Sequence, residues 1–242
     1  MIAMGGADKV LLEQQDVPVE QEHLADQAPG RTLGDARALR ESAPLLRLVS
    51  PEMEIDDVII TRGDKSNEPA ECVGVSPAVL EMNLHTLAHG RFFTDLDEEN
   101  ANPVCVIGTG IRDDLFGSPE KPGREIIPLG EVIYLDGQPF TIVGMFERYE
   151  GEQEKKAREE AKKRAPDQQA GPARARGWGR GGNWAFYRKN QTIYMPLNTA
   201  WLRFRAAGDA SGTPDNRLTS IDLKVNGLDQ LEPALQQARN VL

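Results

Sequence analysis

An Asp-Gly pair between two alternating apolar runs constrains the fold of this chain more than any other feature. The runs lie within residues 132–144, and Asp136 and Gly137 join them. Both positions of such a two-residue turn need positive φ, which glycine and aspartate tolerate better than most residues. The segment therefore predicts an antiparallel β-hairpin.

The residues before this hairpin predict a strand and a short helix. Residues 104–107 form an apolar run of strand length, and Thr109 can cap the turn that follows. The next apolar residues share one helical face: Ile111, Leu115 and Phe116. Residues 90–146 are therefore predicted to be a unit of strand, helix and hairpin around which the rest of the chain is arranged.

Two further helices are marked by their first residues. Thr32 and Asp35 have the spacing of a capping box, which predicts a helix that ends before Pro44. Its buried residues would be Leu33, Ala36 and Leu39. Ser76 followed by Pro77 is typical of a helix start, because proline is favoured at the first helical position. The residues of that helix that face the core would be Leu80, Leu84 and Leu87.

Alternation near the C-terminus predicts a half-buried strand over residues 218–225. Ile221, Leu223 and Val225 would lie on one face, and Asp222 and Lys224 on the other. The final helix would place one set of residues on a single face: Leu231, Leu235, Ala238 and Leu242. Other strands are expected at residues 45–50, 58–61, 70–75 and 192–195, and a helix at residues 197–205.

Several short motifs also occur in a fixed order along the chain. They are Asp35-Ala36-x-Ala38-Leu39, Pro44-Leu45-Leu46-x-Leu48-Val49-Ser50-Pro51, Val73-Gly74-Val75-Ser76-Pro77, Gly90-Arg91-Phe92-Phe93-Thr94, Val104-x-Val106-Ile107-Gly108, Leu115-Phe116-Gly117, Phe140-Thr141-Ile142-Val143-Gly144 and Ile193-Tyr194-Met195-Pro196-Leu197-Asn198-Thr199. In this order they resemble the extracytoplasmic core domain of MacB-type ABC transporter permeases. The resemblance spans roughly residues 30–242.

The resemblance implies an α+β fold built from two parts. Residues 1–89 and 197–242, the two chain ends, would form a split βα subdomain of the porter-like α/β type. Residues 90–196 would form an inserted, mostly-β subdomain. The two termini would then lie close together at the membrane-facing end.

The resemblance also implies a function without catalysis or a cofactor. The domain would transmit ATP-driven motion of transmembrane helices to an extracytoplasmic substrate or adaptor. Its partners would be the flanking transmembrane helices of the same permease, a cytoplasmic ABC ATPase, a second permease in a dimer, and a periplasmic adaptor or a lipoprotein or peptide substrate. It would belong to the cell inner membrane and face the periplasm or the extracellular side.

The bulk composition argues against nucleic acid as the main partner. Lys and Arg number 28 against 38 Asp and Glu, a net charge of −10, whereas phosphate binding needs a basic surface. No window approaches the roughly 20 apolar residues of a spanning helix. Residues 1–6 lack the basic start and apolar centre of a signal peptide. With the resemblance, these features predict a water-soluble segment of a longer permease.

Two cysteines and two glycines bear on chemistry. Cys72 and Cys105 lie in apolar strand-like runs without a neighbouring histidine or CxxC spacing, which favours two buried free thiols over a disulfide or a redox centre. Gly108 and Gly110 follow a strand and precede a helix, as in a dinucleotide-binding turn. The third glycine is missing, so a tight strand-to-helix turn is the favoured interpretation.

Two groups of potential metal ligands were weighed in the same way. His85 and His89 would lie one turn apart on a helix, which is a legitimate zinc spacing, but a third ligand is not apparent. Acidic residues follow Thr94 at positions 95 and 97–99 without the glycine and terminal glutamate of an EF-hand. A capped helix N-terminus, with Arg91 paired to a carboxylate, explains them better. The sequence therefore predicts no metal site.

Residues 147–190 differ in composition from the rest of the chain. They hold 12 Lys and Arg against 7 Asp and Glu, including a Glu/Lys/Arg/Ala-rich helical run followed by a Gly-rich basic loop. This charged insertion departs from the family pattern. Trp178, Arg180 and Trp184 are predicted partner contacts, because aromatic and arginine side chains dominate binding hot spots. The alternative is that the aromatic residues fold back onto the domain.

Two rival functions remain open at this point. One is a metal- or nucleotide-dependent periplasmic enzyme that uses His85 and His89 or Gly108 and Gly110. The other is a standalone periplasmic binding module.

Overall fold

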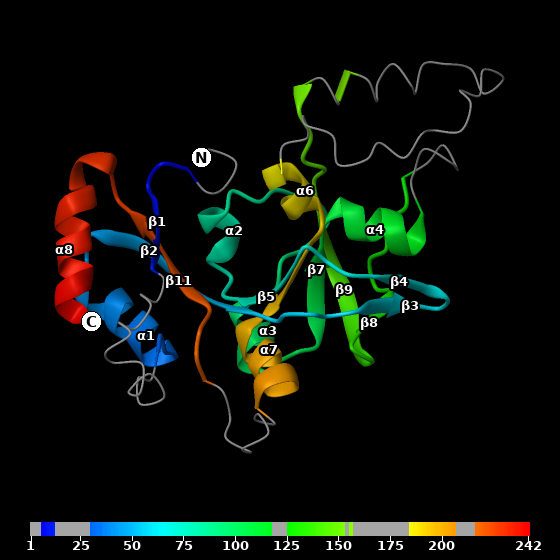
Figure 1. The fold of residues 1–242 in the computed structure, drawn as a ribbon, viewed down its shortest axis with the longest axis horizontal. Coiled ribbons are helices and arrows are strands. Elements are labelled where there is room, and N and C mark those ends of the chain that lie inside the picture. Colours follow the sequence, from blue (N-terminus) through cyan, green and yellow to red (C-terminus); the bar gives the residue numbers. More distant parts are fainter. Residues whose placement is uncertain (1–5, 13–29, 118–124, 153–154, 157–183, 207–215) are drawn as a thin grey trace, which may run out of the picture.

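The described strands form one mixed β-sheet. The computed structural model describes residues 6–12, 30–117, 125–152, 155–156, 184–206 and 216–242. Within them the sheet has eleven strands: ten follow the order β1-β11-β2-β5-β10-β7-β9-β8-β3-β4, and the eleventh, β6, pairs with β9 (Figure 1). The strands are β1 Lys9–Leu12, β2 Leu46–Glu54, β3 Ile60–Arg62, β4 Lys65–Asn67, β5 Glu71–Val75, β6 Leu87–Gly90, β7 Val104–Ile107, β8 Val132–Leu135, β9 Gln138–Phe146, β10 Thr192–Pro196 and β11 Ser220–Val225. The α+β class is confirmed.

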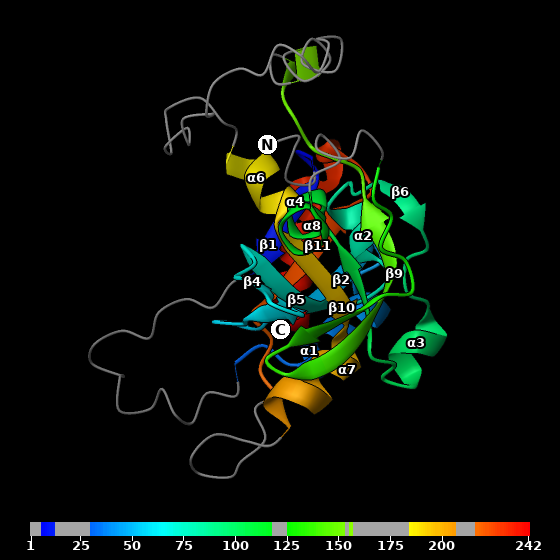
Figure 2. The ribbon, with the colours of Figure 1, turned by 90° about the vertical axis from the view of Figure 1, so that its right-hand side faces the viewer.

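Helices cover both faces of this sheet. They are α1 Leu33–Ser42, α2 Val79–Met82, α3 Asp95–Glu99, α4 Thr109–Phe116, α6 Trp184–Asn190, α7 Leu197–Ala200 and α8 Leu231–Val241. A π-helical turn, Trp201–Arg205, extends α7, and a 3-10 turn, Leu228–Gln230, precedes α8. Figure 2 shows α6 and α7 at opposite ends of β10. Among the described residues no helix combines the length and the apolarity needed to cross a bilayer.

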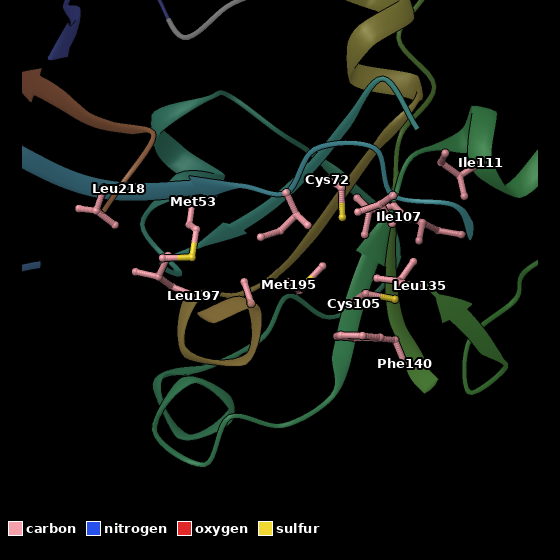
Figure 3. Packing of buried hydrophobic residues seen from close by; sticks show 14 of the residues in the cluster. Met53, Cys72, Cys105, Ile107, Ile111, Leu135, Phe140, Met195, Leu197 and Leu218 are labelled. Carbon is pink, nitrogen blue, oxygen red and sulfur yellow. The ribbon is translucent and has the colours of Figure 1, made fainter. Parts of the chain in front are cut away.

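Two hydrophobic clusters lie on opposite faces of the sheet. The larger cluster includes Cys72, Cys105 and Met195 from the central strands (Figure 3). Residues of α1, α4, α7 and α8 belong to the same cluster. The smaller cluster takes the alternate residues Val73 and Val106 and packs them with α2. Because successive strand residues point to opposite faces, one set of strands supplies both clusters. Cys72 and Cys105 are buried and unbridged, as predicted.

The predicted hairpin is confirmed. Leu135 of β8 pairs with Gln138 of β9, and the turn residues Asp136 and Gly137 have φ values of 48° and 78°. Ile133 of β8 is buried while its neighbours in the strand, at positions 132 and 134, are exposed. The hairpin therefore has one face in the core, as its alternating sequence predicts.

Both ends of the described chain enter the same edge of the sheet. β1 pairs antiparallel with β11, and Lys9 lies opposite Lys224. β1 was not predicted, because the first 30 residues are polar. β1 and α8 lie on the same side of the molecule in Figure 1, far from β3 and β4. The sheet is continuous from end to end, and the division into subdomains at residues 89/90 and 196/197 stays a prediction.

The helix predicted after Ser76 and Pro77 is wrong beyond Met82. Leu84 has a φ of 52° and is 43% exposed, and Leu87 begins strand β6 instead of facing the core from a helix. Positive φ at a non-glycine residue breaks the helix, and pairing of β6 with β9 satisfies the backbone beyond it.

Smaller corrections concern helix ends and exposure. The capping box of Thr32 and Asp35 is present, but Leu33 is 42% exposed. Gly108, not Thr109, is the N-cap of α4. In α8 the fully buried residues are Ala234 and Ala238, and Val241 packs, partly buried, against the larger cluster.

Strand β11 is buried on both faces, although its sequence predicted a half-buried strand. All six of its residues are buried, including Asp222 at 1% and Lys224 at 3% exposure. Helix α2 packs against β11 on the face that was expected to be open, and β1 pairs along its outer edge. This burial of charged side chains creates the candidate site.

Candidate functional site

A polar cleft lies on the face of the sheet that carries the smaller hydrophobic cluster. It encloses about 220 Å³. Its lining side chains come from β1, β11, β2, β5, β10 and α6, and from Asn83 and His85, which follow α2. Most of its lining residues are charged or hydrogen-bonding. A concave site with several ionisable groups is the default candidate for ligand binding in such a domain.

Strand alternation places four carboxyl groups in this cleft. Glu52 and Glu54 flank Met53, whose side chain points into the core on the opposite face. In the same way, Asp222 alternates with the core residues of β11, and Glu71 precedes Cys72 of β5. Because β11, β2 and β5 are neighbours in the sheet, these acids lie on one surface.

Three cations come from the two elements at the sides of the cleft. Lys9 of β1 places its Nζ 2.5 Å from Oδ2 of Asp222. Arg188 of α6 lies 2.6 Å from Oε1 of Glu71. Lys189 of α6 donates a hydrogen bond of 2.8 Å to the carbonyl oxygen of Asn83 and lies over the ring of Tyr149. Ion pairs therefore join both chain ends and α6 to the sheet.

Asn83 connects these groups into one network. Its Oδ1 accepts a hydrogen bond from Lys9 Nζ at 2.5 Å, and its Nδ2 donates to the hydroxyl of Tyr194 at 3.1 Å. The hydroxyl of Tyr194 also lies 3.3 Å from Nε2 of His85, whose Nδ1 lies 3.2 Å from the hydroxyl of Tyr149. A satisfied buried network of this kind fixes one arrangement of the surrounding elements.

Burial perturbs the ionisation of several groups in the cleft. Burial, and then the charge of Asp222, raise the pKa of Glu52 well above its usual value. Burial lowers the pKa of His85 to about 3, so the imidazole is neutral at physiological pH. Burial, with repulsion from Lys9, lowers the pKa of Lys189 to about 8. Perturbed values that cluster in a cleft are typical of functional sites.

The two histidines of the predicted metal pair lie apart in the fold. His85 follows α2 and stacks on Phe146 at 4.4 Å, whereas His89 belongs to strand β6 and lies 3.3 Å from Glu125. The one-turn helical spacing was wrong because α2 ends before either histidine. In the part of the chain that the structure covers, no three His, Cys, Asp or Glu residues are grouped to hold a metal.

The space beside the two glycines of the predicted strand-to-helix turn is occupied by another part of the chain. A Cβ added at Gly108 or Gly110 would collide with the carbonyl oxygen of Asn190, at the end of α6. The close approach that these glycines permit therefore serves packing of α4 against α6 rather than contact with a phosphate.

The acidic group near residue 97 forms a structural corner. Thr94 and Asp97 form a capping box at the start of α3, and Arg91 Nη1 lies 2.7 Å from Asp97 Oδ2. The hydrogen bond from Arg91 is the main reason why the pKa of Asp97 lies far below its usual value. The predicted cap and the predicted pairing of Arg91 with a carboxylate are confirmed.

Of the three predicted partner contacts, Trp184 alone lies within the described residues. It begins α6 and is 59% exposed, with the guanidinium of Arg188 5.4 Å from its ring centroid. Trp178, Arg180 and most of the predicted charged helix lie in 157–183, outside the described residues. Asn190 closes the base of the charged insertion, because its side chain accepts from the N–H and donates to the carbonyl of Tyr149.

The sequence did not predict the residues that build the cleft. Glu52, Asp222 and Lys9 lie in three separate strands, and each reads as a solvent-facing residue of its own segment. Alternation in β2 and β11 does predict that Glu52 and Asp222 leave the main core, which was the one available signal. Their burial depends on β1 and α2, which local sequence did not place against these strands.

Two solved structures share the fold of this chain. The extracellular domain of the noncanonic ABC-type transporter YknZ from Gram-positive bacteria matches with a TM-score of 0.63 and 16% identity, over 97% of this chain and 92% of that one. The periplasmic region of MacB from Actinobacillus actinomycetemcomitans matches with a TM-score of 0.61 and 15% identity, over 99% of this chain and 86% of that one. The chain thus has the fold of outward-facing domains of ABC transporters.

Sequence comparison identifies the family. The model of the MacB-like periplasmic core domain matches residues 5–161, and the chain belongs to this family. The macrolide export ATP-binding/permease protein MacB of Syntrophobacter fumaroxidans is 27% identical over 111 residues, which is 46% of this chain and 14% of that protein. The predicted resemblance is confirmed: this is the periplasmic core domain of a MacB-like ABC transporter permease.

Proposed function

We propose that this domain transmits the ATP-driven motion of transmembrane helices to a substrate or an adaptor outside the inner membrane. Membership of a permease family supports this role, and the relative from Syntrophobacter is named as an export protein with an ATP-binding part. The proposed partners are the flanking helices of the same permease, a cytoplasmic ABC ATPase, a second permease copy, and a periplasmic adaptor or a lipoprotein or peptide substrate.

The pairing of β1 with β11 is the observation that carries the proposal. Through it, the first and the last described segments belong to one sheet that continues to β4. Every strand in that sheet is hydrogen-bonded to its neighbours, and packed interiors transmit displacement instead of absorbing it. A displacement applied at the β1/β11 edge would therefore move the entire body as a unit.

In this proposal the sheet acts as a rigid lever, and the region around α6 is the part that contacts a partner. Asn190 and Arg188 hold α6 to Tyr149 and Glu71, so the exposed side chain of Trp184 has a fixed base. Trp178 and Arg180, which lie outside the described residues, stay predicted partner contacts. Any rotation of the sheet would displace a partner that is bound there.

Distance measurements between spin labels in the complete transporter test the proposal. Cysteines are introduced at exposed positions of α3 and α8, Leu96→Cys and Glu232→Cys. Labelled chains are diluted with unlabelled ones to report distances within one domain, and Glu232→Cys alone reports distances between two copies. The transporter without introduced cysteines is the labelling control, and both native cysteines of this domain are buried.

We expect ATP turnover to change the distance between copies and to leave the distance within one domain unchanged. If the distance within one domain changes as much as the distance between copies, the domain does not move as a rigid unit and the proposal is wrong. If the distance between copies does not change during ATP turnover, the domain does not transmit the motion and the proposal is also wrong.

A further inference from the structure

An exposed apolar face lies on the antiparallel part of the sheet formed by β9, β8, β3 and β4. Tyr134 of β8 lies directly opposite Thr61 of β3 and Pro139 of β9, and residues paired in this way have side chains on the same face. Val132 and Ile59 share that face, because each lies two residues before one of its members. Ile59, Val132 and Tyr134 are 47%, 40% and 43% exposed. Together with Pro139 they form the apolar face.

The composition of this face differs from that of an ordinary solvated one. An antiparallel sheet with one face in the core normally has polar side chains on the other. Strand β8 does alternate, and its residues Ile133 and Leu135 are fully buried, but its outward residues are Val132 and Tyr134. Apolar residues exposed singly are common, whereas adjacent ones on one face are typical of a surface that another molecule covers.

An acidic hollow of about 400 Å³ adjoins the apolar face, and Ile59 belongs to both. Its walls are the segments 54–59, which leads from β2 toward β3, and 68–72, which leads from β4 into β5. Its lining includes no lysine, arginine or histidine, and it includes five acids: Glu54, Asp56, Asp57, Glu68 and Glu71. Although Glu71 pairs with Arg188 of α6, the hollow as a whole is acidic. Asp136 adds a further acid beside the hollow, since its Oδ1 accepts a hydrogen bond of 2.9 Å from the N–H of Ile59.

The charge of the hollow selects among the possible occupants of the apolar face. A second copy of this chain, docked through the same face, would bring two acidic hollows together on chains of net charge −10. Anionic lipid headgroups would be repelled for the same reason. A polypeptide segment that combines apolar side chains with lysine or arginine complements both parts of the surface.

We propose that the apolar face and the acidic hollow bind a cationic, amphipathic segment of a partner protein. Its apolar side chains pack on Val132, Tyr134 and Ile59, and its lysine or arginine side chains enter the hollow beside Asp57 and Glu68. Tyrosine suits such a role, because its ring gives a large contact area and few rotamers are lost on binding. The surface does not include Trp184, and the proposal does not depend on the transmission of motion.

Fluorescence anisotropy with a labelled synthetic peptide tests the proposal on the unsubstituted chain. The probe is a peptide of about 14 residues, with leucine and lysine spaced to give an apolar face and a basic face. Two peptides of the same length are controls, one with glutamate in place of every lysine and one with serine in place of every leucine. We expect saturable binding of one leucine–lysine peptide per chain and no saturable binding of either control peptide.

Two double variants locate the site. Ile59→Thr with Tyr134→Thr keeps residues that favour strands and should weaken peptide binding about tenfold to hundredfold, the range for loss of two apolar anchors. Asp56→Asn with Asp57→Asn should weaken binding about threefold to tenfold, because the lost ion pairs are exposed to solvent. Asparagine also tolerates the positive φ of 56° at Asp57.

Two matched double variants are the controls. Leu96→Thr with Leu228→Thr changes two apolar residues that are 64% and 59% exposed and lie outside the apolar face. Glu99→Gln with Glu232→Gln removes two exposed acids that lie outside the hollow. Both should bind the peptide like the unsubstituted chain.

Several outcomes would overturn the proposal. They are no saturable binding of the leucine–lysine peptide, equal affinity in the site variants and their matched controls, or equal binding of the glutamate peptide. Self-association of the chain, or its binding to phosphatidylglycerol vesicles, would assign the face to another occupant if Tyr134→Thr abolished it. Circular dichroism shows whether each variant folds. If Ile59→Thr with Tyr134→Thr does not, the exposed pair Asp56→Asn with Asp57→Asn and the control peptides still decide the question.

Discussion

The ammonium nitrogen of Lys9 lies 2.5 Å from Oδ2 of Asp222, across the pairing of β1 with β11. The strand register puts Leu11 directly opposite Asp222, so the ion pair is diagonal. This contact fixes the first described strand on the last one. It also decides whether the fully buried carboxylate of Asp222 is tolerated.

Lys9→Met should destabilise the domain by about 3–5 kcal/mol, because it leaves a buried carboxylate without its counter-ion. Urea unfolding at pH 7 measures the effect. Adding Asp222→Asn to the same chain should recover most of the loss, since the uncompensated charge is then removed. Lys65→Met on the exposed hairpin strand β4 is the control. An equal loss in the single and double variants would contradict the assignment.

Asp97→Asn should lower stability by about 1–2 kcal/mol at neutral pH, from the lost cap and from an ion pair that is screened at its exposed Arg91 end. The folded-state pKa of Asp97 is depressed, so its contribution is fully present above the unfolded pKa near ~4 and is lost as the pH falls below it. The difference from the unsubstituted chain should therefore shrink in acid. Asp95→Asn, its exposed neighbour, should change little. A difference that is independent of pH would argue against the ion pair.

Glu52→Gln should behave in the opposite way. The folded state raises the pKa of Glu52, so its folding contribution is most favourable below the unfolded pKa near ~4.3 and is lost as the pH rises through the folded value. The variant should match the unsubstituted chain near pH 4 and exceed it by about 1–3 kcal/mol at pH 8–9. Denaturation at both pH values checks this, with Glu232→Gln as control. Destabilisation at high pH would contradict it.

Cys72 and Cys105 should not react with a thiol reagent in the folded protein. Both are at most 2% exposed, and burial raises the pKa of each thiol, so little thiolate is available. Reaction with Ellman's reagent should follow the unfolding rate and reach two thiols per chain in urea. Fast reaction in buffer without urea would place a thiol at the surface.

Local sequence predicted the elements whose geometry is set within a few residues. The hairpin at Asp136-Gly137 depends on two residues with positive φ, and the predicted capping box of Thr32 depends on a side chain three positions away. A cap by Thr94 or Asp95 was also predicted, and Thr94 is the cap. Family resemblance along the chain added the class of protein. The helix expected through Leu84 and Leu87 failed because strand pairing with β9 overrode helical periodicity.

The sequence by itself determined the α+β class, the main core and the family, because alternation, caps and motif order are local properties. Only the tertiary structure decided whether Glu52, Asp222 and Lys9 are buried or exposed to solvent. Alternation directs Glu52 and Asp222 away from the main core, but whether they meet water or protein depends on β1 and α2, which lie elsewhere in the sequence. The free energy of a charged side chain is set by this covering layer, so the polar cleft is a property of the assembled sheet.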